Sequence, residues 1–270
     1  SFLHIQSGHF DASVLTGAEC GRTQSQARSA SLTLDWNPTS VTPGQDPIGR
    51  AQEVTQPDIF IGSPHSTRHE AELQRGIQYP IQYYPLFEIA LRSVARETVS
   101  THLNRIAELW AGFSTVAKSN PDAWIQREYS AKEIATPTEF NRPISLPYPK
   151  LMNSNNSVDQ GAALIVTSSV KAEQLGIPRS RWIYPHASTE AWDHLHVSER
   201  DNLHSSPAIR LAAGRLFELT GLDSESFDYV DLYSCFPSAV QIAANEIGLR
   251  QNRSLTVTGG LTFAGVPWNN

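Results

Sequence analysis

The second half of the sequence alternates between short apolar segments typical of strands and amphipathic segments typical of helices. This alternation restricts the fold more than any other feature. Strand-like segments occupy 161–168, 181–188 and 229–234, and helical segments occupy 169–176, 206–221 and 237–248. The run GAALIVTS over 161–168 is continuously apolar, as expected of a strand buried on both faces. The series predicts an α/β fold with a mostly parallel sheet covered by helices.

The local signals for where these helices begin and end are clear. Ser206 and Pro207 form a favourable start for one helix, and Gly221 forms its end. Gly176 likewise closes the short helix after the 161–168 strand.

The first 150 residues are less regular. The run ASVLTGA over 12–18 predicts a buried strand, and the polar stretch from about 19 to 66 predicts an irregular excursion. Apolar residues at helical spacing between 84 and 119 predict two helices, which Asn120-Pro121 ends. Four prolines in TPTEFNRPISLPYPK predict a linker. We divide the chain into 1–19, 20–150 and 151–270.

Composition limits the classes of partner and compartment. With 270 residues, 40% of them hydrophobic, the chain can build a large core. The net charge of −6 argues against nucleic acid, so an anionic ligand would need a local basic pocket. Two distant cysteines fit a reducing compartment, and we expect a cytoplasmic protein without a membrane span. Both ends cut into apparent elements, so we expect an internal fragment.

The stretch DLYSCFPSAV offers the strongest chemical signal from residue types alone. It places Tyr233 and Cys235 between a strand and a helix, where ligands bind in parallel sheets. The helix N-terminus would lower the thiol pKa of Cys235, although a buried, inert cysteine is the competing interpretation. His186 follows the run WIYP, is interpreted as a loop residue that could line a pocket, and is a third candidate catalytic residue.

Metal binding has little support in the sequence. His65 and His69 lie four residues apart, but Pro64 disfavours a helix there and no third ligand accompanies them. We expect no metal site. P-loop, dinucleotide-binding and G-x-S-x-G motifs are also absent from the sequence.

Four segments together resemble the thiolase superfamily, in matching order and spacing. They are IQSGHFDASVLTGAE, LMNSNNSVDQGAALIVTS, DLYSCFPSAVQ and TGGLTFAGVP. The resemblance is greatest to the acetyl-CoA acetyltransferase type, related to sterol-carrier-type thiolases. It implies a thiolase fold of two β-α-β-α-β halves, here truncated at both ends. Residues 1–19 would close the first half, 20–150 would form the loop excursion, and 151–270 would form an incomplete second half.

The resemblance also implies a ligand. A coenzyme A thioester would be the substrate, with no permanently bound cofactor. The substrate-binding residues implied are Asn155, Asn156, Ser157, Phe236, Gly260 and Gly265.

Several positions depart from the thiolase pattern. Val266 stands where thiolases have the histidine of Gly-His-Pro, which activates a nucleophilic cysteine. Tyr233 replaces an oxyanion-hole residue, Asn156 lies near the position of a serine that contacts coenzyme A, and Gln160 replaces an aspartate. The nucleophile itself would precede Ser1, and a second catalytic cysteine would follow Asn270.

Three functions remain open. The first is a thiolase-type acyltransferase, and the second is a carbon–carbon lyase acting on an acyl-CoA with a tyrosine as acid or base. The third is a non-catalytic acyl-CoA-binding or partner subunit. Homodimerisation or pairing with a partner subunit is expected from the resemblance.

Overall fold

The computed structural model describes residues 2–34, 68–250 and 252–266 of the chain. Its helices and strands follow one another in this order: α1 (Phe2–Gln6), β1 (Ala12–Cys20), α2 (Gly21–Ser29), α3 (Glu70–Gln74), α4 (Pro80–Ala95), α5 (Val99–Ser119), α6 (Ala131–Ala135), β2 (Pro143–Ser145), β3 (Tyr148–Pro149), β4 (Asp159–Thr167), α7 (Ser169–Gln174), α8 (Pro207–Thr220), α9 (Pro237–Ile247) and α10 (Gly260–Phe263). Short 3-10 turns lie at Lys150–Met152, Arg179–Arg181 and Val197–Glu199.

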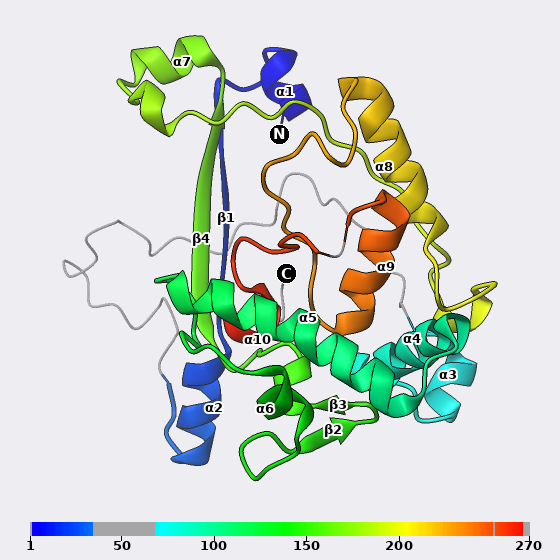
Figure 1. Cartoon of the computed structure of the whole chain (residues 1–270). Helices are drawn as coiled ribbons and strands as arrows, with labels where there is room; N and C mark the ends of the chain where they lie inside the picture. The colour runs from blue at the N-terminus through cyan, green and yellow to red at the C-terminus, as the bar shows by residue number, and fades with distance from the viewer. Residues whose placement is uncertain (1, 35–67, 251, 267–270) are drawn as a thin grey trace.

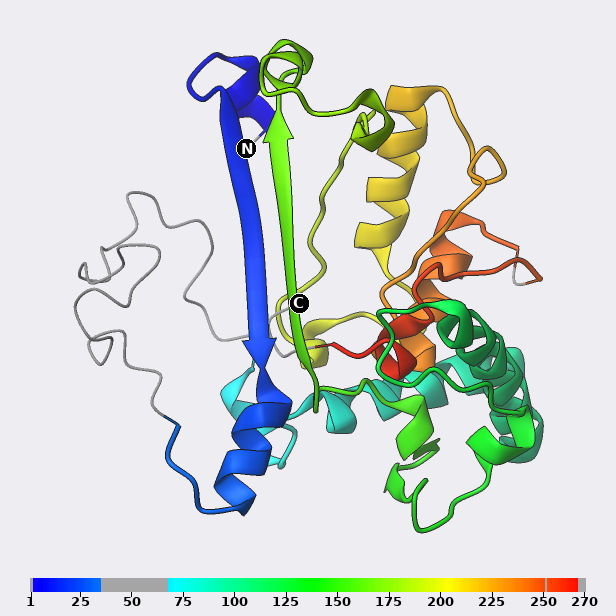
Figure 2. The ribbon, with the colours of Figure 1, turned by 90° about the vertical axis from the view of Figure 1, so that its left-hand side faces the viewer.

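Strands β1 and β4 form a long antiparallel ribbon along one side of the molecule (Figure 1). Helices α1 and α7 lie at one end of the ribbon and α2 at the other (Figure 2). The register pairs Val14 with Ile165 and Leu15 with Leu164, and all four side chains are exposed. The prediction that these two apolar strands are buried is therefore wrong for the described residues, because no other element covers either face of the ribbon there.

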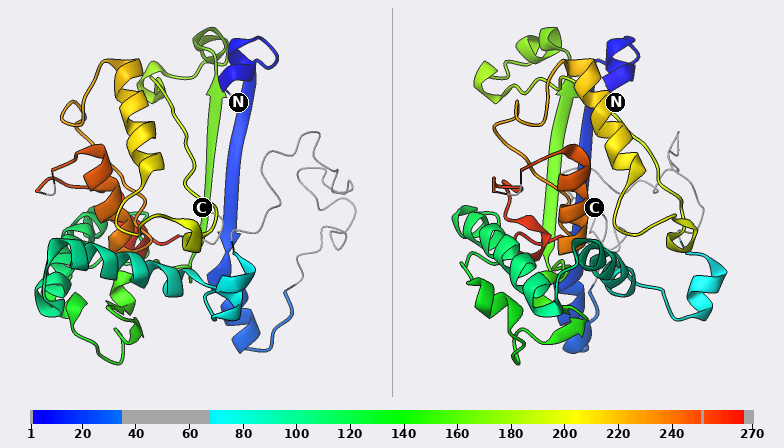
Figure 3. Two further views of the ribbon diagram at one scale, coloured as in Figure 1. Left: turned by 90° about the vertical axis from the view of Figure 1, so that its right-hand side faces the viewer. Right: turned by 45° about the vertical axis from the view of Figure 1, so that its right-hand side comes forward.

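The core lies around α5, which contacts α6, α9 and α10 (Figure 3). Helix α5 buries one apolar stripe that includes Ile106, Trp110 and Phe113. Trp110 is fully buried and donates from its indole N–H to the Thr262 hydroxyl, 3.0 Å away. Phe236, at the start of α9, is 1% exposed within the same core. The core thus joins the central helices to the last described segment of the chain.

The predicted helix boundaries are confirmed at most sites. Ser206 accepts a hydrogen bond from the backbone N–H of Ile209 and caps α8, and Gly221 ends α8 in the left-handed conformation. Asn120 ends α5. These capping signals are local in the sequence, so the ends of the helices can be predicted without knowledge of the fold.

Two predicted strands are not assigned as strands. Residues 182–188 and 229–234 are irregular, and the ladders among the described residues, β1–β4 and β2–β3, are both antiparallel. A strand needs a neighbouring strand for its backbone N–H and C=O groups, and the described residues offer none at these positions. Leu232 makes a single ladder-like bond, from its N–H to the carbonyl of Leu255 at 3.0 Å. The predicted parallel ladder is therefore not present among these residues.

The proline-rich segment predicted as a linker is packed instead. Its residues form the small β2–β3 pair, and Tyr148 on β3 is only 1% exposed. Prolines remove backbone donors but do not prevent burial of the side chains between them. Part of the predicted excursion, residues 35–67, lies outside the described residues, and the divisions at 19 and 150 stay predictions.

None of the helices over residues 2–34, 68–250 and 252–266 combines the length and apolar character needed to cross a membrane.

Candidate functional site

Three segments that the sequence singled out converge in space. The backbone N–H of Ser154 donates to the carbonyl of Cys235 at 3.0 Å. The N–H of Asn155 donates to Leu261 at 3.0 Å, and the carbonyl of Asn155 accepts from Val266 at 2.9 Å. The asparagine-rich segment is therefore held between the 233–236 segment and the glycine-rich segment.

The glycines at 259, 260 and 265 allow this close approach. All three have positive φ, at +96°, +75° and +95°. A Cβ at Gly259 would lie 2.4 Å from the Cβ of Ala117, and one at Gly260 would lie 2.4 Å from the Phe113 ring. Gly259 and Gly260 pack the chain against α5, and Gly265 packs against Val158 and Trp124, so these glycines approach other parts of the protein itself. Neither Gly260 nor Gly265 lines the pocket that the three segments surround.

That pocket, called the main pocket here, has a volume of about 790 Å³. Its polar lining comes from the asparagine-rich segment, namely Asn153, Ser154, Asn155, Asn156 and Ser157. Three cations also line it, Arg22, Arg142 and Lys150, and among the described residues no carboxylate does. In a chain with a net charge of −6, this is a local basic environment suited to an anionic ligand.

The basic residues differ in their surroundings. The Arg22 guanidinium lies over the Trp124 ring, 5.1 Å from its centroid. Neither Arg142 nor Lys150 has an ion pair within the described part of the chain. Cations without a carboxylate partner retain their donors for phosphate or carboxylate groups of a ligand.

Cys235 lies directly before α9 at the wall of the main pocket, and it is 4% exposed. Burial raises the pKa of its thiol to about 11, and the hydrogen bonds from Tyr84 and Tyr233 offset this only in part. The expectation that the helix N-terminus lowers this pKa is therefore wrong, because loss of hydration outweighs it. The thiol stays protonated at neutral pH.

Two tyrosines stand beside this thiol and differ in exposure. Tyr233 is 55% exposed and lines the main pocket. Tyr84, on α4, is half-buried and stacks on Phe236 with ring centroids 4.4 Å apart. Burial raises the pKa of the Tyr84 hydroxyl well above its ordinary range, so this group can only donate or accept hydrogen bonds as a neutral phenol.

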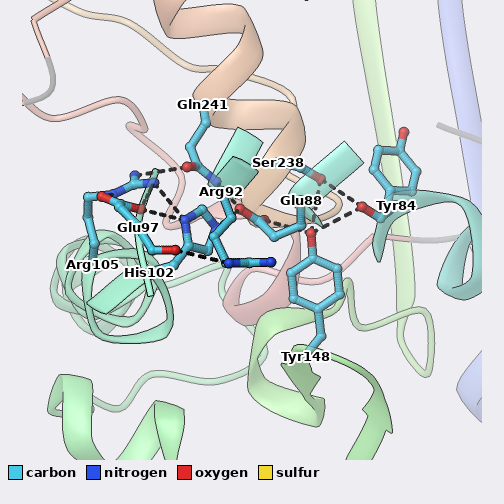
Figure 4. Close-up of polar contacts among 9 residues, drawn as sticks. All are labelled: Tyr84, Glu88, Arg92, Glu97, His102, Arg105, Tyr148, Ser238 and Gln241. Atoms are coloured by element: carbon cyan, nitrogen blue, oxygen red, sulfur yellow. Dashed lines mark hydrogen bonds and ion pairs between the residues drawn. The ribbon is translucent and has the colours of Figure 1, made fainter. Parts of the chain in front are cut away.

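A buried polar network links α4, which carries Tyr84, to α5 and α9 (Figure 4). Glu88 of α4 is fully buried, and its Oε1 lies 2.6 Å from Nε2 of His102. The other ring nitrogen of His102 lies 2.6 Å from Glu97 Oε2. Arg105 then donates to Glu97 at 2.8 Å and to Gln241 of α9 at 2.8 Å. The network therefore links α4, α5 and α9 through charge-assisted hydrogen bonds.

The same network extends toward the pocket. The Tyr148 hydroxyl donates to Glu88 Oε2 at 2.7 Å and lies 3.0 Å from the Ser238 hydroxyl (Figure 4). Both hydroxyls lie 3.4 Å from the carbonyl oxygen of Tyr84. The backbone of Tyr84 is thus fixed relative to α9 and to Cys235, which precedes it.

The structure brings most of the predicted site residues together. The main pocket is lined by Tyr233, Cys235, Phe236, Asn155, Asn156 and Ser157. His186 is exposed and lines neither this pocket nor the second pocket described below, so it is not brought to the site. Sequence reasoning missed Tyr84, Trp124 and the three basic residues.

The potential metal ligands do not cluster within the described residues, where no group of three or more histidine, cysteine or acidic side chains could hold an ion. His69 accepts a hydrogen bond from the N–H of Ala71 at the start of α3. His65, its predicted neighbour, lies outside the described residues.

Comparison with known proteins connects this arrangement to thiolases. No family model matches the sequence. The chain is similar to a monomeric SCP2-thiolase like protein type 1 from Mycobacterium smegmatis, with a TM-score of 0.68 and 35% identity over 76% of this chain and 46% of that chain. It is also similar to the Ltp2-ChsH2(DUF35) aldolase, with a TM-score of 0.64 and 17% identity over 97% of this chain and 63% of that one. An acetyl-CoA acetyltransferase of Methanocaldococcus jannaschii is 26% identical over 106 residues, which is 39% of this chain and 26% of that protein.

The chain therefore has a thiolase fold, and the resemblance to the thiolase superfamily is confirmed. Within that fold its sequence is similar to that of the SCP2-thiolase like protein. It spans less than half of the SCP2-thiolase like protein and about a quarter of the acetyltransferase.

Proposed function

We propose that the protein binds a coenzyme A thioester in the main pocket. The observation that carries this proposal is the pocket lining: three cations and a run of asparagine and serine, with no carboxylate from the part of the chain that the structure describes. Coenzyme A carries several phosphates and an amide-rich arm, and these groups match basic and hydrogen-bonding side chains. The thioester would then lie beside Tyr233 and Cys235.

Cleavage or formation of a carbon–carbon bond in the acyl group is the chemistry that this site supports best. Cys235 is protonated at neutral pH, and Val266 supplies no base to activate a thiol. Tyr233, which is 55% exposed and lies beside Cys235, is the proton-transfer group that we place at the thioester. For a β-hydroxyacyl thioester, Tyr233 as its phenolate would accept the hydroxyl proton while the Cα–Cβ bond breaks, and the hydroxyl oxygen becomes the carbonyl oxygen of the released product. The electron pair of that bond forms a thioester enolate, which takes a proton back at Cα. The aldolase among the similar structures supports this choice of reaction.

Acyl transfer of the acetyl-CoA acetyltransferase type is the second candidate. The local similarity to an acetyl-CoA acetyltransferase favours it. It requires a nucleophilic cysteine other than Cys235. A non-catalytic acyl-CoA-binding subunit is the third. We also propose a cytoplasmic protein that forms a homodimer or pairs with a partner subunit.

Calorimetric titration with coenzyme A and acetyl-CoA tests the binding proposal. We expect saturable binding, and we expect Lys150→Ala or Arg142→Ala to weaken it roughly tenfold, the value of one charge-assisted hydrogen bond. Lys132→Ala, an exposed lysine on α6 outside the pocket, is the matched control and should bind like the wild type. Absence of heat and of any thermal shift with either ligand would rule the proposal out.

Steady-state assays separate the two reactions. With a β-hydroxyacyl-CoA we expect Tyr233→Phe to reduce kcat by about 100-fold or more while affinity for the thioester is nearly unchanged, because only a proton-transfer group is lost. Val266→His should not restore thiolysis of acetoacetyl-CoA, because it returns a single group. Robust thiolysis by the wild type, or a fully active Tyr233→Phe, would instead favour acyl transfer.

A further inference from the structure

A second pocket of about 770 Å³ adjoins the main pocket. It lies between α4, the 189–200 segment, α8 and α9. Pro80, Tyr84 and Tyr233 line both pockets, so the two meet where the thioester would lie.

The lining of the second pocket differs in character from that of the main pocket. Its walls are largely apolar, formed by Tyr83, Phe87, Trp192, Leu195, Ile209 and Ile242. Trp192 is 81% exposed, which leaves a large apolar side chain uncovered at this wall. An apolar cavity of this size suits an apolar ligand group far larger than an acetyl group.

The polar groups of the second pocket are largely satisfied by the protein. Asp193 accepts from Ser206 at 2.6 Å, from the N–H of Ala208 at 3.1 Å, and pairs with Arg200 at 3.2 Å. The Thr189 hydroxyl donates to the carbonyl of Ala212 at 2.8 Å. The charged lining residues balance, with two cations (Arg68 and Arg200) and two carboxylates (Glu190 and Asp193). The second pocket therefore has no excess charge for an anion.

We infer that the second pocket receives the acyl group of the thioester, and that the natural substrate carries a bulky apolar acyl group of about eight carbons or more. This inference rests on the proposed binding of coenzyme A in the main pocket. The continuity of a basic pocket with an apolar one, joined at Tyr84 and Tyr233, matches an amphiphilic ligand with an anionic head and an apolar tail. Small side chains at Ala212, Ala239 and Ala243 leave the volume open.

Calorimetry with coenzyme A, acetyl-CoA and octanoyl-CoA tests this inference. A buried methylene tightens binding roughly fourfold, so six additional methylenes, even partly buried, should tighten octanoyl-CoA by at least about 50-fold over acetyl-CoA. Ala243→Phe, which fills the second pocket from α9, should reduce that preference at least tenfold (an estimate from the same burial scale) and leave coenzyme A affinity unchanged. Ala243→Leu fills less of the second pocket and serves as the alternative variant if Ala243→Phe does not fold.

The control is Ala95→Phe, an exposed alanine at the end of α4 that lines neither pocket. It should keep the octanoyl preference. Coenzyme A binding without any preference for the longer chain would overturn the inference and leave the proposed function standing. If Ala243→Phe changed the oligomeric state but not the preference for octanoyl-CoA, the second pocket would be a surface that contacts another polypeptide. That result would also overturn the inference. Failure of all three ligands to bind would overturn both.

Discussion

Gly259 is a single residue on which the convergence of the site segments depends. Its φ of +96° lies in a region that residues with a Cβ rarely adopt, and any Cβ would collide with Ala117 on α5. The glycine-rich sequence signalled a close approach, but only the fold reveals that α5 is the element approached.

Gly259→Ala should lower the free energy of unfolding by about 2–4 kcal/mol, from left-handed strain plus overpacking. Urea denaturation monitored by circular dichroism measures this change. Gly112→Ala is the matched control, because Gly112 is exposed in α5 and nothing lies within 4 Å of a Cβ there. It should stabilise the protein by up to about 1 kcal/mol. Equal effects of the two substitutions would contradict the packing role of Gly259.

Cys235 should react slowly with iodoacetamide near pH 7.5, because the thiolate is the reactive form and burial raises the pKa of this thiol to about 11. Its labelling rate should rise as pH increases toward that value. Peptide mass spectrometry gives the rate for each cysteine, with the partly exposed Cys20 as an internal comparison. Rapid labelling of Cys235 at pH 7.5 in the folded protein would show that its burial does not protect it.

The residues of the site were only partly predictable. Tyr233, Cys235 and Asn155 belong to recognisable motifs, and all three line the main pocket. Tyr84 lies in a segment without such a motif, and it reaches the pocket because tertiary packing brings α4 there. Lys150 directly precedes the asparagine-rich motif but is not part of it. His186 lies within the apolar run at 181–188, which does not form a strand among the described residues, and its side chain is exposed.

At the scale of elements, helices were predictable and extended segments were not. The helices α4, α5, α8 and α9 carry their capping and apolar periodicity within their own sequence. A strand depends on a partner distant in the chain, as in the pairing of β1 with β4. The apolar runs at 181–188 and 229–234 have the composition of strands but no such partner in the described residues.

The α4–α5–α9 network makes this part of the protein sensitive to acid. The hydrogen bond from Arg105, and then that from His102, holds the pKa of Glu97 below its ordinary value of 4.5. A depressed carboxyl pKa contributes stability above the unfolded-state pKa, and this contribution is lost as pH falls through the folded-state value. The free energy of unfolding should therefore fall as pH decreases below about 4.5.

Glu97→Gln should make that decrease shallower, since it removes one of the groups responsible. Urea denaturation between pH 3 and pH 7 measures the slope. Glu139→Gln is the control, because Glu139 is exposed and forms no ion pair within the described ranges. Identical slopes for Glu97→Gln and the wild type would remove Glu97 from the explanation.

At the scale of the whole molecule, the β1–β4 ribbon exposes apolar side chains on both of its faces. Val14 and Ile165, a cross-strand pair on one face, are 65% and 61% exposed. Leu15 and Leu164, on the other face, are 40% and 64% exposed. An apolar ribbon that is open on both faces, with unpaired outer edges in the described structure, favours association with other chains.

We therefore expect residues 1–270, expressed alone, to self-associate or aggregate at micromolar concentration. The double variant Val14→Lys with Ile165→Glu should reduce association, because it replaces apolar surface by charge while keeping a favourable cross-strand pair. Size-exclusion chromatography with light scattering measures the molar mass. Leu211→Lys, at an exposed leucine on α8, adds a charge away from the ribbon and should leave association unchanged. The contrary result would be a wild-type chain that stays monomeric and unfolds in one cooperative transition. It would show that the ribbon is stable while exposed to solvent, and that association with another polypeptide is not needed to cover it.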